Sequence, residues 1–491
     1  MTMPIRLFNT MTRRKEVFES IEPQVVRMYV CGPTVYDSPH LGHGRASVVY
    51  DILVRWLKYR GYRVKYVRNI TDVGHILEDI GEDRMMVGAK RERLHPMEIA
   101  DKYTLEYLEA MDKLGNERPS IQPRASGHIM EIIEMVEKLV EKGYGYVVDG
   151  NVYFDVSKFE DYGKLSGVKR EELIKHRVEP DPRKRNPADF ALWKAAPEGY
   201  PLRWRSPWGY GFPGWHIECS VMSVKYLGEQ IDIHGGAREL VFPHHENSLA
   251  QTEAYTGKKP FVRYWVHCGL LTINGEKMSK SKGNVVNLLA ALEKWGKDVL
   301  RMFYISAHYR SDIDFNENAV KMAAENVRRI SDVIERVGSM KPVDRPLDEV
   351  ERKLLEATRR ARAEFEERMD DDLDTPGALA VLFGYIREFN RLTSGRDELN
   401  AEVKKEVIGF LDMVRRVFGI LETRKTEVST ELVEKLISLI VDVREILRRE
   451  KRYDLSDMIR SRLREVGVEL QDTAEGPRWR LLERSGISFL K

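Results

Sequence analysis

The spacing of apolar and polar residues predicts alternating strands and helices in the first half of this chain. Residues 25–30 form an apolar run typical of a buried strand. Apolar side chains then recur on one face of a helix that we expect to end at Gly61. That face carries Val48, Val49, Ile52, Leu53, Trp56 and Leu57. Later strand-like runs cover residues 62–69, 231–236 and 266–273, and later helical runs cover 96–142 and 242–256. This alternation predicts an α/β fold with a parallel sheet built in two halves.

A predicted β-hairpin at residues 147–154 interrupts this order, because Asp149-Gly150 is a two-residue turn signal between short apolar runs. We therefore expect a mixed insertion between the two halves of the sheet. From about residue 320 only the helical period remains, which predicts a helical bundle. Its amphipathic segments lie near 320–337, 354–369, 375–391 and 403–418. A small Arg-rich module follows from about residue 425 and ends in Gly-Pro-Arg-Trp-Arg (476–480), a combination that can clamp RNA bases.

Composition narrows the class of protein. The 491 residues leave room for several domains, and 42% hydrophobic with 32% charged residues is typical of a globular protein in water. The net charge is only +2, so any surface for nucleic acid must be a local patch. Three cysteines exclude a disulfide framework and favour a reducing compartment. Residues 1–9 do not resemble a signal peptide and no apolar run reaches membrane-spanning length, so we expect a cytoplasmic protein without membrane contact.

The turn between the strand at 25–30 and the following helix holds the first candidate site. Residues 31–44 are crowded with Gly, Pro and His, and they lie at the carboxyl end of a strand, where ligands bind in open α/β sheets. Unpaired N–H groups of the first helical turn favour a phosphate there. His40 and His43 place two imidazoles at the helix start, and Gly42 lets a flat ligand approach the backbone. Cys31 lies at the strand tip, where a simply buried thiol is the ordinary alternative.

Three later stretches carry residues with similar chemistry. Residues 277–282, Lys-Met-Ser-Lys-Ser-Lys, follow a hairpin signal at Asn274-Gly275 and concentrate cations on a loop. The strings at 214–219 (Gly-Trp-His-Ile-Glu-Cys) and 242–248 (Phe-Pro-His-His-Glu-Asn-Ser) contain Cys and His. A fourth stretch, the basic loop at 180–187, is either a solvated loop or a contact for the end of an RNA.

Together these motifs produce a family resemblance. With His40 to His43 and Lys277 to Ser281 in this order, on an α/β core followed by a helical bundle, the sequence resembles the class I aminoacyl-tRNA synthetases. The strings at 31–37, 214–219 and 242–247 look like those of the cysteinyl-tRNA synthetase family in particular. The resemblance covers nearly the whole chain. It implies ATP-dependent activation of L-cysteine to cysteinyl-adenylate, and transfer of the cysteinyl group to the 3′-terminal adenosine of tRNA(Cys).

The resemblance also implies a role for each matching residue. The catalytic residues would be His40, His43, Lys277 and Lys280, whose donors and cations suit the charge on the phosphates. ATP, with Mg²⁺, would be bound by Pro33, Thr34, His40, Gly42, His43, Lys277, Met278, Ser279, Lys280 and Ser281. The amino-acid pocket would be lined by Gly32, Thr71, Trp215 and His234, although Trp215 alone would also suit core packing.

The family holds one zinc ion that binds the substrate thiolate, using two Cys, a His and a Glu. The matching positions here are Cys31, Cys219 and His244, and Ser248 stands where the pattern has Glu. Ser248 is one helical turn from His244, so its position is right, but a serine hydroxyl is a poor zinc ligand. Three protein ligands leave an open coordination position, which a substrate-binding zinc needs. We expect zinc at this site, and we take Cys268 as an ordinary buried thiol.

The resemblance gives functional names to the predicted domains. We expect a Rossmann-like catalytic domain in two halves, a helical-bundle anticodon-binding domain, and a small basic tRNA-binding module. We also expect a monomer whose partners are tRNA, ATP and cysteine. The divisions are 1–125 and 201–255 for the catalytic halves, 126–200 for the connective insertion, 256–319 for the stem-contact region with the lysine-rich loop, 320–424 for the bundle and 425–491 for the module.

Two other functions stay open from the sequence. A ligase of the mycothiol pathway has a similar catalytic core and joins cysteine to an amino sugar, but it lacks the bundle expected at 320–491. A non-catalytic, synthetase-like RNA-binding protein would not need the catalytic His and Lys residues, while Ser248 keeps that alternative in consideration.

Overall fold

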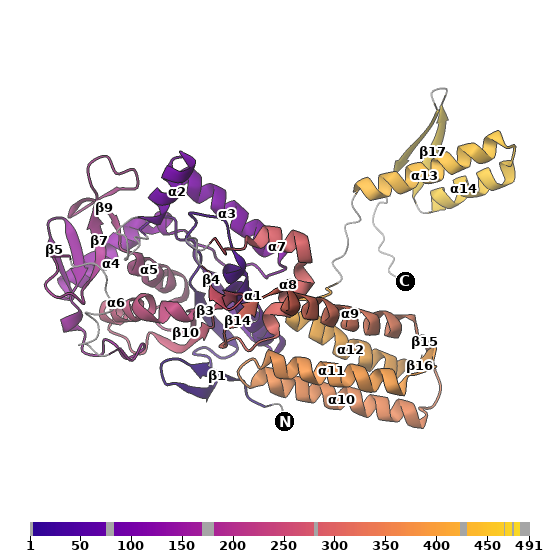
Figure 1. Ribbon diagram of the computed structural model, residues 1–491, viewed down its shortest axis with the longest axis horizontal. Helices are drawn as coiled ribbons and strands as arrows, with labels where there is room; N and C mark the ends of the chain where they lie inside the picture. The colour runs from indigo at the N-terminus through magenta and orange to yellow at the C-terminus, as the bar shows by residue number, and fades with distance from the viewer. Residues whose placement is uncertain are drawn as a thin grey trace. The chain divides into compact units, whose positions relative to one another are not determined.

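The computed structural model describes residues 3–74, 83–168, 181–278, 283–422, 430–465, 467–473 and 476–481. The chain divides into two compact units, Met1–Leu421 and Glu422–Lys491. Within the larger unit, a parallel sheet, an antiparallel insertion sheet and a helical bundle follow one another (Figure 1). The predicted α/β fold class with a helical bundle is therefore confirmed, whereas the functional division of the chain stays a prediction.

The central sheet has four parallel strands in the order β11-β10-β3-β4. Its strands are β3 (Val25–Val30), β4 (Arg63–Arg68), β10 (Ile231–Ala237) and β11 (Val262–Cys268). Helix α1 (Leu41–Tyr59) connects β3 to β4, and α6 (Glu246–Thr256) lies between β10 and β11 in the chain. From the central β3–β10 pair, the chain therefore adds β4 on one side of the sheet and β11 on the other. Such a switch in strand order opens a crevice at the carboxyl ends of the strands.

The insertion contains a second, antiparallel sheet in the order β5-β6-β7-β9-β8. Its strands are β5 (Gly145–Val148), β6 (Asn151–Phe154), β7 (Phe190–Ala195), β8 (Trp204–Ser206) and β9 (Gly209–Pro213). The predicted hairpin is β5–β6, and Asp149 and Gly150 both have positive φ at its turn, as the Asp-Gly signal requires. Because β8 and β9 belong to this sheet, it extends beyond residue 200, where the sequence placed the end of the insertion.

The single helical run predicted over 96–142 is wrong, because two helices occupy that stretch. Helix α3 (Pro96–Lys113) ends before Gly115, and α4 (Ile129–Glu141) begins only after a short 3₁₀ turn. Gly115 has φ of +78°, which suits a residue just past a helix end. Pro119 and Pro123 then prevent a helix from continuing, since proline lacks the backbone N–H. Ile121 instead bridges to Val67, and this loop therefore extends the sheet edge beside β4.

The remaining elements of the larger unit surround the sheet and build the bundle. The bundle helices are α9 (Glu317–Ser339), α10 (Glu349–Asp370), α11 (Thr375–Leu392) and α12 (Ala401–Phe418), close to the four predicted amphipathic segments. The other helices are α2 (Arg84–Glu92), α5 (Trp215–Leu227), α7 (Leu288–Trp295) and α8 (Lys297–Ile305). Short strands are β1 (Arg6–Asn9), β2 (Arg14–Val17), β12 (Leu271–Ile273), β13 (Glu276–Lys277), β14 (Ile313–Phe315), β15 (Lys341–Val343) and β16 (Glu398–Asn400).

The smaller unit has its own apolar core. It consists of α13 (Thr430–Arg449), α14 (Tyr453–Glu465) and a hairpin of β17 (Val468–Thr473) with β18 (Gly476–Leu481). Ile437 and Val441 pack with residues of α14 and β17, and Trp479 lies against this cluster. The aromatic residue of the terminal Gly-Pro-Arg-Trp string is thus half-buried, so packing accounts for part of its role.

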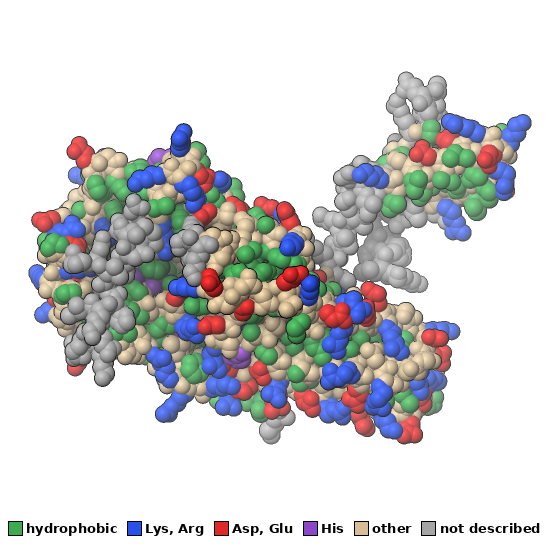
Figure 2. All heavy atoms as spheres, in the orientation of Figure 1, with side chains coloured by type: hydrophobic (Ala, Val, Ile, Leu, Met, Phe, Trp, Pro, Cys, Tyr) green, Lys and Arg blue, Asp and Glu red, His purple; other side chains and the backbone are tan. Residues whose placement is uncertain are grey.

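Charge is spread over the surface of the larger unit. On the face drawn in Figure 2, Lys and Arg side chains over the bundle are interspersed with Asp and Glu. Exposed ion pairs between Arg328 and Asp332 and between Lys353 and Glu349 are examples. None of the helices within the described ranges is long and apolar enough to cross a membrane.

Candidate active site and metal centre

The candidate site lies at the crevice where the sheet switches direction. Cys31 directly follows β3, and its backbone N–H donates to Gly235 O of β10 at 3.1 Å. At the end of β4, Asn69 and Thr71 continue along the same edge, and Thr34 bridges to Thr71. The carboxyl ends of β3 and β4 therefore bring the residues of the 31–44 turn next to those that follow β4.

His40 and His43 form the start of α1 as the sequence predicts. Gly42 N donates to His40 Nδ1 and His40 N donates to His43 Nδ1, both at 3.1 Å, so each imidazole caps one backbone N–H. The two rings stack with their centroids 3.9 Å apart. Capping satisfies donors that would otherwise be unpaired at a helix N-terminus. The N–H groups of residues 41–44 are all hydrogen-bonded within the protein, so the predicted unpaired donors are absent from this turn, while the positive end of the helix dipole still favours a phosphate.

The second predicted motif comes close to the first. A Cβ atom placed on Gly42 would lie 3.2 Å from the Cε of Met278 and 3.0 Å from the His40 ring. Leu41 N donates to Val286 O, and Leu288 N donates to Pro39 O. These two backbone hydrogen bonds hold the segment after the lysine-rich loop against the 31–44 turn.

Lys277 is exposed on β13, next to Met278. Ser279, Lys280 and Ser281 lie outside the described residues. The structure thus joins the beginning of this motif to the His-Gly-His turn.

Cys31, Cys219 and His244 come together although they lie on three separate segments. Cys31 Sγ and Cys219 Sγ are 3.8 Å apart, and His244 Nε2 is 3.4 Å from Cys219 Sγ. All three potential ligand atoms lie within 4.8 Å of one another. A tetrahedral zinc with Zn–S of about 2.3 Å and Zn–N of about 2.0–2.1 Å separates its ligand atoms by roughly 3.5–3.8 Å. The observed separations therefore fit a zinc ion with two thiolates and one imidazole.

Ser248 is fully buried, and its hydroxyl group is engaged in the protein backbone. Ser248 Oγ donates to His244 O at 2.9 Å, one helical turn earlier, and lies 3.3 Å from His216 O. The hydroxyl therefore supports the segment that carries His244 instead of joining the ligand group. This geometry agrees with a metal site of three protein ligands and an open position.

Burial and mutual contact set the protonation of the cysteines and histidines. The hydrogen bond shared with Cys31 lowers the pKa of Cys219 well below its ordinary value, while burial raises the pKa of Cys31. Burial also lowers the pKa of His234 and His245 well below the ordinary value, and that of His267 to about 3. The thiolate is the form of cysteine that binds a metal, so the lowered pKa of Cys219 suits a metal ligand.

The residues predicted for the amino-acid pocket lie around the metal group at different depths. Trp215, at the start of α5, is half-buried and stacks on His244 with ring centroids 4.3 Å apart, which places it beside the metal group. Thr71 is buried and accepts from Asn69 Nδ2 at 3.0 Å. Gly32 N donates to Asn69 Oδ1, and a Cβ at Gly32 would lie 1.6 Å from Asn69 O. His234 is completely buried and stacks on Trp265 behind the pocket.

Pro33 and Thr34 stay in the strand-end turn, where Pro33 O accepts from Thr71 N at 3.0 Å. They hold the two strand ends together. Their predicted role in ATP binding stays a prediction.

The sequence reasoning missed a chain of hydrogen bonds that ends on Cys31. His245 Nε2 is 3.1 Å from Cys31 Sγ, its Nδ1 is 2.7 Å from His267 Nε2, and His267 Nδ1 is 2.8 Å from Thr10 Oγ1. Cys31, His234 and His245 also form a second group that could hold a metal. The 242–248 string contained His245, but His267 and Thr10 carry no local signal, since only the folded sheet brings them to this site.

Asn69 was missed as well. It binds both Gly32 and Thr71, and its Oδ1 is 3.9 Å from Cys219 Sγ. Its position at the end of β4 was the available signal, because polar residues at strand ends often face the crevice.

Comparison with known proteins agrees with this site. Residues 17–325 match the family model described as the tRNA synthetases class I (C) catalytic domain, and residues 364–422 match the DALR domain. A cysteine–tRNA ligase of Thermus thermophilus is 47% identical over 98% of this chain and 100% of the relative. A cysteine–tRNA ligase of Thermococcus gammatolerans is 44% identical over 98% of this chain and 100% of the relative.

Solved structures show the same fold at low identity. Mycobacterium tuberculosis methionyl-tRNA synthetase in complex with methionyl-adenylate has a TM-score of 0.59 and 14% identity, covering 80% of this chain and 90% of the other. A leucyl-tRNA synthetase complex from Agrobacterium radiobacter has a TM-score of 0.60 and 12% identity, covering 82% of this chain and 84% of the other.

Proposed function

The chain belongs to the cysteine–tRNA ligase family of class I aminoacyl-tRNA synthetases, and we propose how its residues carry out that reaction. In the first step, the carboxylate of L-cysteine attacks the α-phosphorus of ATP, and pyrophosphate leaves. In the second, a hydroxyl of the terminal ribose of tRNA(Cys) attacks the carbonyl carbon, and AMP leaves. The observation that carries the assignment is the contact of Met278 with the His-Gly-His part of the 31–44 turn. The first residue of that turn, Cys31, belongs to the Cys31–Cys219–His244 group.

In this proposal, His40 and His43 hold the phosphates of ATP at the start of α1. Stacking and capping fix both rings before the nucleotide arrives, so little reorganisation is needed when charge develops on the leaving pyrophosphate. Lys277 and Lys280 bring cations to the same phosphates, Lys277 from β13 and Lys280 from the adjoining loop. Mg²⁺ accompanies ATP as it does in other phosphoryl sites. No nucleophilic side chain is needed, because the substrate carboxylate attacks.

We assign the zinc site to Cys31, Cys219 and His244, which leaves one position open for the thiolate of cysteine. Zinc bound there would lower the pKa of the substrate thiol and favour a soft thiolate over a hydroxyl. The chain from Thr10 through His267 and His245 orients Cys31, as residues around metal ligands commonly do. Trp215 covers His244 and restricts access to one side of the group.

The bundle and the smaller unit are proposed to bind the tRNA. The DALR-domain match over residues 364–422 supports this role for the bundle. We also propose that the protein works in the cytoplasm, because all three cysteines are free thiols, as expected in a reducing compartment. We propose in addition that it is a monomer. Sedimentation equilibrium would test the monomer directly.

Two assays separate this function from the alternatives. Cysteine-dependent exchange of pyrophosphate into ATP should proceed without tRNA, and a transcript of tRNA(Cys) should then be charged. A chain that exchanges pyrophosphate but charges only an amino sugar would be the mycothiol-type ligase. A chain that binds tRNA without any exchange would be the non-catalytic RNA-binding protein.

A further inference from the structure

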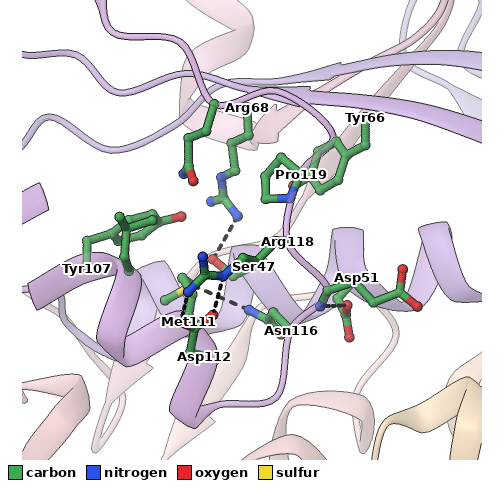
Figure 3. A pocket seen from close by; sticks show the side chains of 13 residues that line it. Ser47, Asp51, Tyr66, Arg68, Tyr107, Met111, Asp112, Asn116, Arg118 and Pro119 are labelled. Carbon is green, nitrogen blue, oxygen red and sulfur yellow. Dashed lines mark hydrogen bonds and ion pairs between the residues drawn. The ribbon is translucent and has the colours of Figure 1, made fainter. Parts of the chain in front are cut away.

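A small cavity lies apart from the crevice, between α1, β4, α3 and the loop that follows α3 (Figure 3). Its volume is about 20 Å³, and a volume of roughly 10–15 Å³ by this measure already holds one water molecule. The cavity therefore accommodates one or two small occupants. The lining residues that can bind an occupant include Ser47 of α1, Arg68 of β4, Tyr107 of α3 and Asn116 of the following loop.

Arg68 brings a positive charge to this cavity without a matching negative one. Its side chain is 6% exposed, and its Nη1 donates to Ser47 Oγ at 2.9 Å. Its Nε has no hydrogen-bond partner, and no carboxylate in the described part of the chain forms an ion pair with it. Burying a guanidinium without a counter-charge is unfavourable, so a buried Arg is ordinarily paired.

Three further groups around Arg68 can donate a hydrogen bond but lack a good acceptor. Tyr107 Oη is buried without a partner, and Figure 3 shows this hydroxyl turned toward the guanidinium of Arg68. The Ser47 hydroxyl accepts from Arg68, and among the described contacts it donates to no other group. Asn116 Nδ2 donates only to the Sδ of Met111 at 3.3 Å, and a thioether is a weak acceptor. The cavity thus has an excess of donors.

The carboxylates near the cavity are already engaged by other cations. Asp51 binds Arg55 and Arg301, and Asp112 binds Arg118. Glu117 pairs with Lys58. These three acids therefore face four bases of their own, and Arg68 adds a further positive charge. An occupant with a negative charge is favoured over a neutral water molecule.

We propose that this cavity is a binding site for one small monovalent anion of the chloride class, held by Arg68, Tyr107, Ser47 and Asn116. The volume excludes a phosphate ester or a nucleotide, and Arg68 Nε, Tyr107 Oη and Asn116 Nδ2 can each donate to an acceptor in the cavity. Bound there, the anion neutralises Arg68 and joins α1 to β4 and α3. These elements carry His40 at one end and Thr71 at another, so the anion stabilises the framework of the active site without touching substrate.

Bromide replaces chloride and can be located directly in crystals of the full chain. In crystals grown with bromide, we expect an anomalous peak in the cavity within about 3.5 Å of Arg68 Nε and Tyr107 Oη. Arg68→Met should remove the peak, and Tyr107→Phe, which changes one hydroxyl only, should weaken it. Arg328→Met is the matched control, because Arg328 is an exposed arginine on α9 that does not line the cavity, and it should keep the peak.

Melting temperatures provide the measurement in solution. Replacing sodium gluconate by sodium chloride at constant ionic strength should raise the melting temperature of the wild type saturably by about 1–3 °C. The same exchange should leave Arg68→Met unchanged and shift Arg328→Met as it shifts the wild type. Water instead of a bromide peak, or a peak that survives Arg68→Met, would overturn the proposal. A bromide peak without any saturable shift would mean binding at crystal concentration only, which also contradicts it.

Discussion

Arg301 and Asp51 form a completely buried ion pair, with Arg301 Nη2 2.5 Å from Asp51 Oδ2 and side chains 0% and 2% exposed. Asp51 lies on α1, the helix that begins with the two active-site histidines. Arg301, on α8, also donates to Phe418 O at the end of α12 at 2.8 Å and to Asn116 Oδ1 at 2.9 Å. One guanidinium thus connects α1, the loop after α3 and the helical bundle.

Removing one member of this pair should destabilise the larger unit strongly. Asp51→Asn leaves the guanidinium of Arg301 buried without its counter-charge, and the expected loss in free energy of unfolding is about 3–5 kcal/mol. Arg301→Met should cost less, because Asp51 keeps Arg55 as a counter-charge at 2.8 Å. The double variant should lose less than the sum of the two, since the guanidinium of Arg301 is then no longer buried without a counter-charge. Urea unfolding of the four proteins measures the coupling.

An exposed pair supplies the control for this cycle. Arg328 and Asp332 on α9 are 62% and 55% exposed, and Asp332→Asn should change stability by less than about 1 kcal/mol. Strict additivity of Asp51→Asn and Arg301→Met would show that the two groups do not depend on each other.

Asp370 should make stability depend on pH between about 4 and 6. Trp56 Nε1 and Arg60 Nη1 both donate to its carboxylate, yet burial raises the pKa of Asp370 to about 6. An unfolded Asp has a pKa of about 3.9, so between these values the folded chain binds more protons than the unfolded one. The contribution to stability is therefore present below about pH 4 and is lost as the pH rises through 6.

Asp370→Asn removes this titration while keeping a neutral side chain of the same shape. We expect the stability of the wild type relative to Asp370→Asn to fall by about 1–2 kcal/mol from pH 4 to pH 7, after allowance for solvent screening. Thermal unfolding of both proteins in matched buffers measures this difference. A difference that stays constant over that range would show that Asp370 is not protonated in the folded protein.

Local patterns predicted the elements that depend on nearby residues. The apolar run at 25–30, the face of α1 and the turn at Asp149-Gly150 each specify a structure within a few residues, and the structure contains all three. Gly115 and two prolines also encode the break after α3 locally. The periodic apolar residues on both sides of the break nevertheless indicate one continuous helix.

Contacts between distant segments could not be derived in this way. Thr10 and His267 join the site only because β1 lies beside β11 and because β11 pairs with β10, which places their side chains at one edge. Arg301 likewise reaches Asp51 through the packing of α8 on α1. The motif at 31–44 could be recognised because strand ends and helix starts have chemistry of their own. The chain of imidazoles behind Cys31 has no such signal.

Gly32 should tolerate no side chain. A Cβ there would lie 1.6 Å from Asn69 O, which is backbone and cannot move aside without displacing the end of β4. Gly32→Ala should therefore destabilise the unit by at least about 1–3 kcal/mol and reduce cysteine-dependent pyrophosphate exchange. Gly127→Ala is the control, because nothing lies within 4 Å of its Cβ and its φ is ordinary, so stability should not fall. Equal effects of the two substitutions would refute this view of Gly32.

The hydroxyl of Ser248 should be dispensable for zinc, because it donates to His244 O and lies near His216 O instead of the ligand group. Ser248→Ala should keep zinc close to one ion per chain, whereas Cys219→Ser and His244→Asn should each reduce zinc content at least tenfold. Zinc can be measured by elemental analysis, and Co²⁺ substitution should show thiolate charge-transfer bands in wild type and Ser248→Ala alike.

Ser248→Glu adds the carboxylate of the family pattern and should tighten zinc, but it also places negative charge beside the incoming thiolate. Its preference for cysteine over serine in pyrophosphate exchange should therefore not exceed that of the wild type. Loss of zinc from Ser248→Ala would show that the serine is a ligand and that three protein groups are not enough.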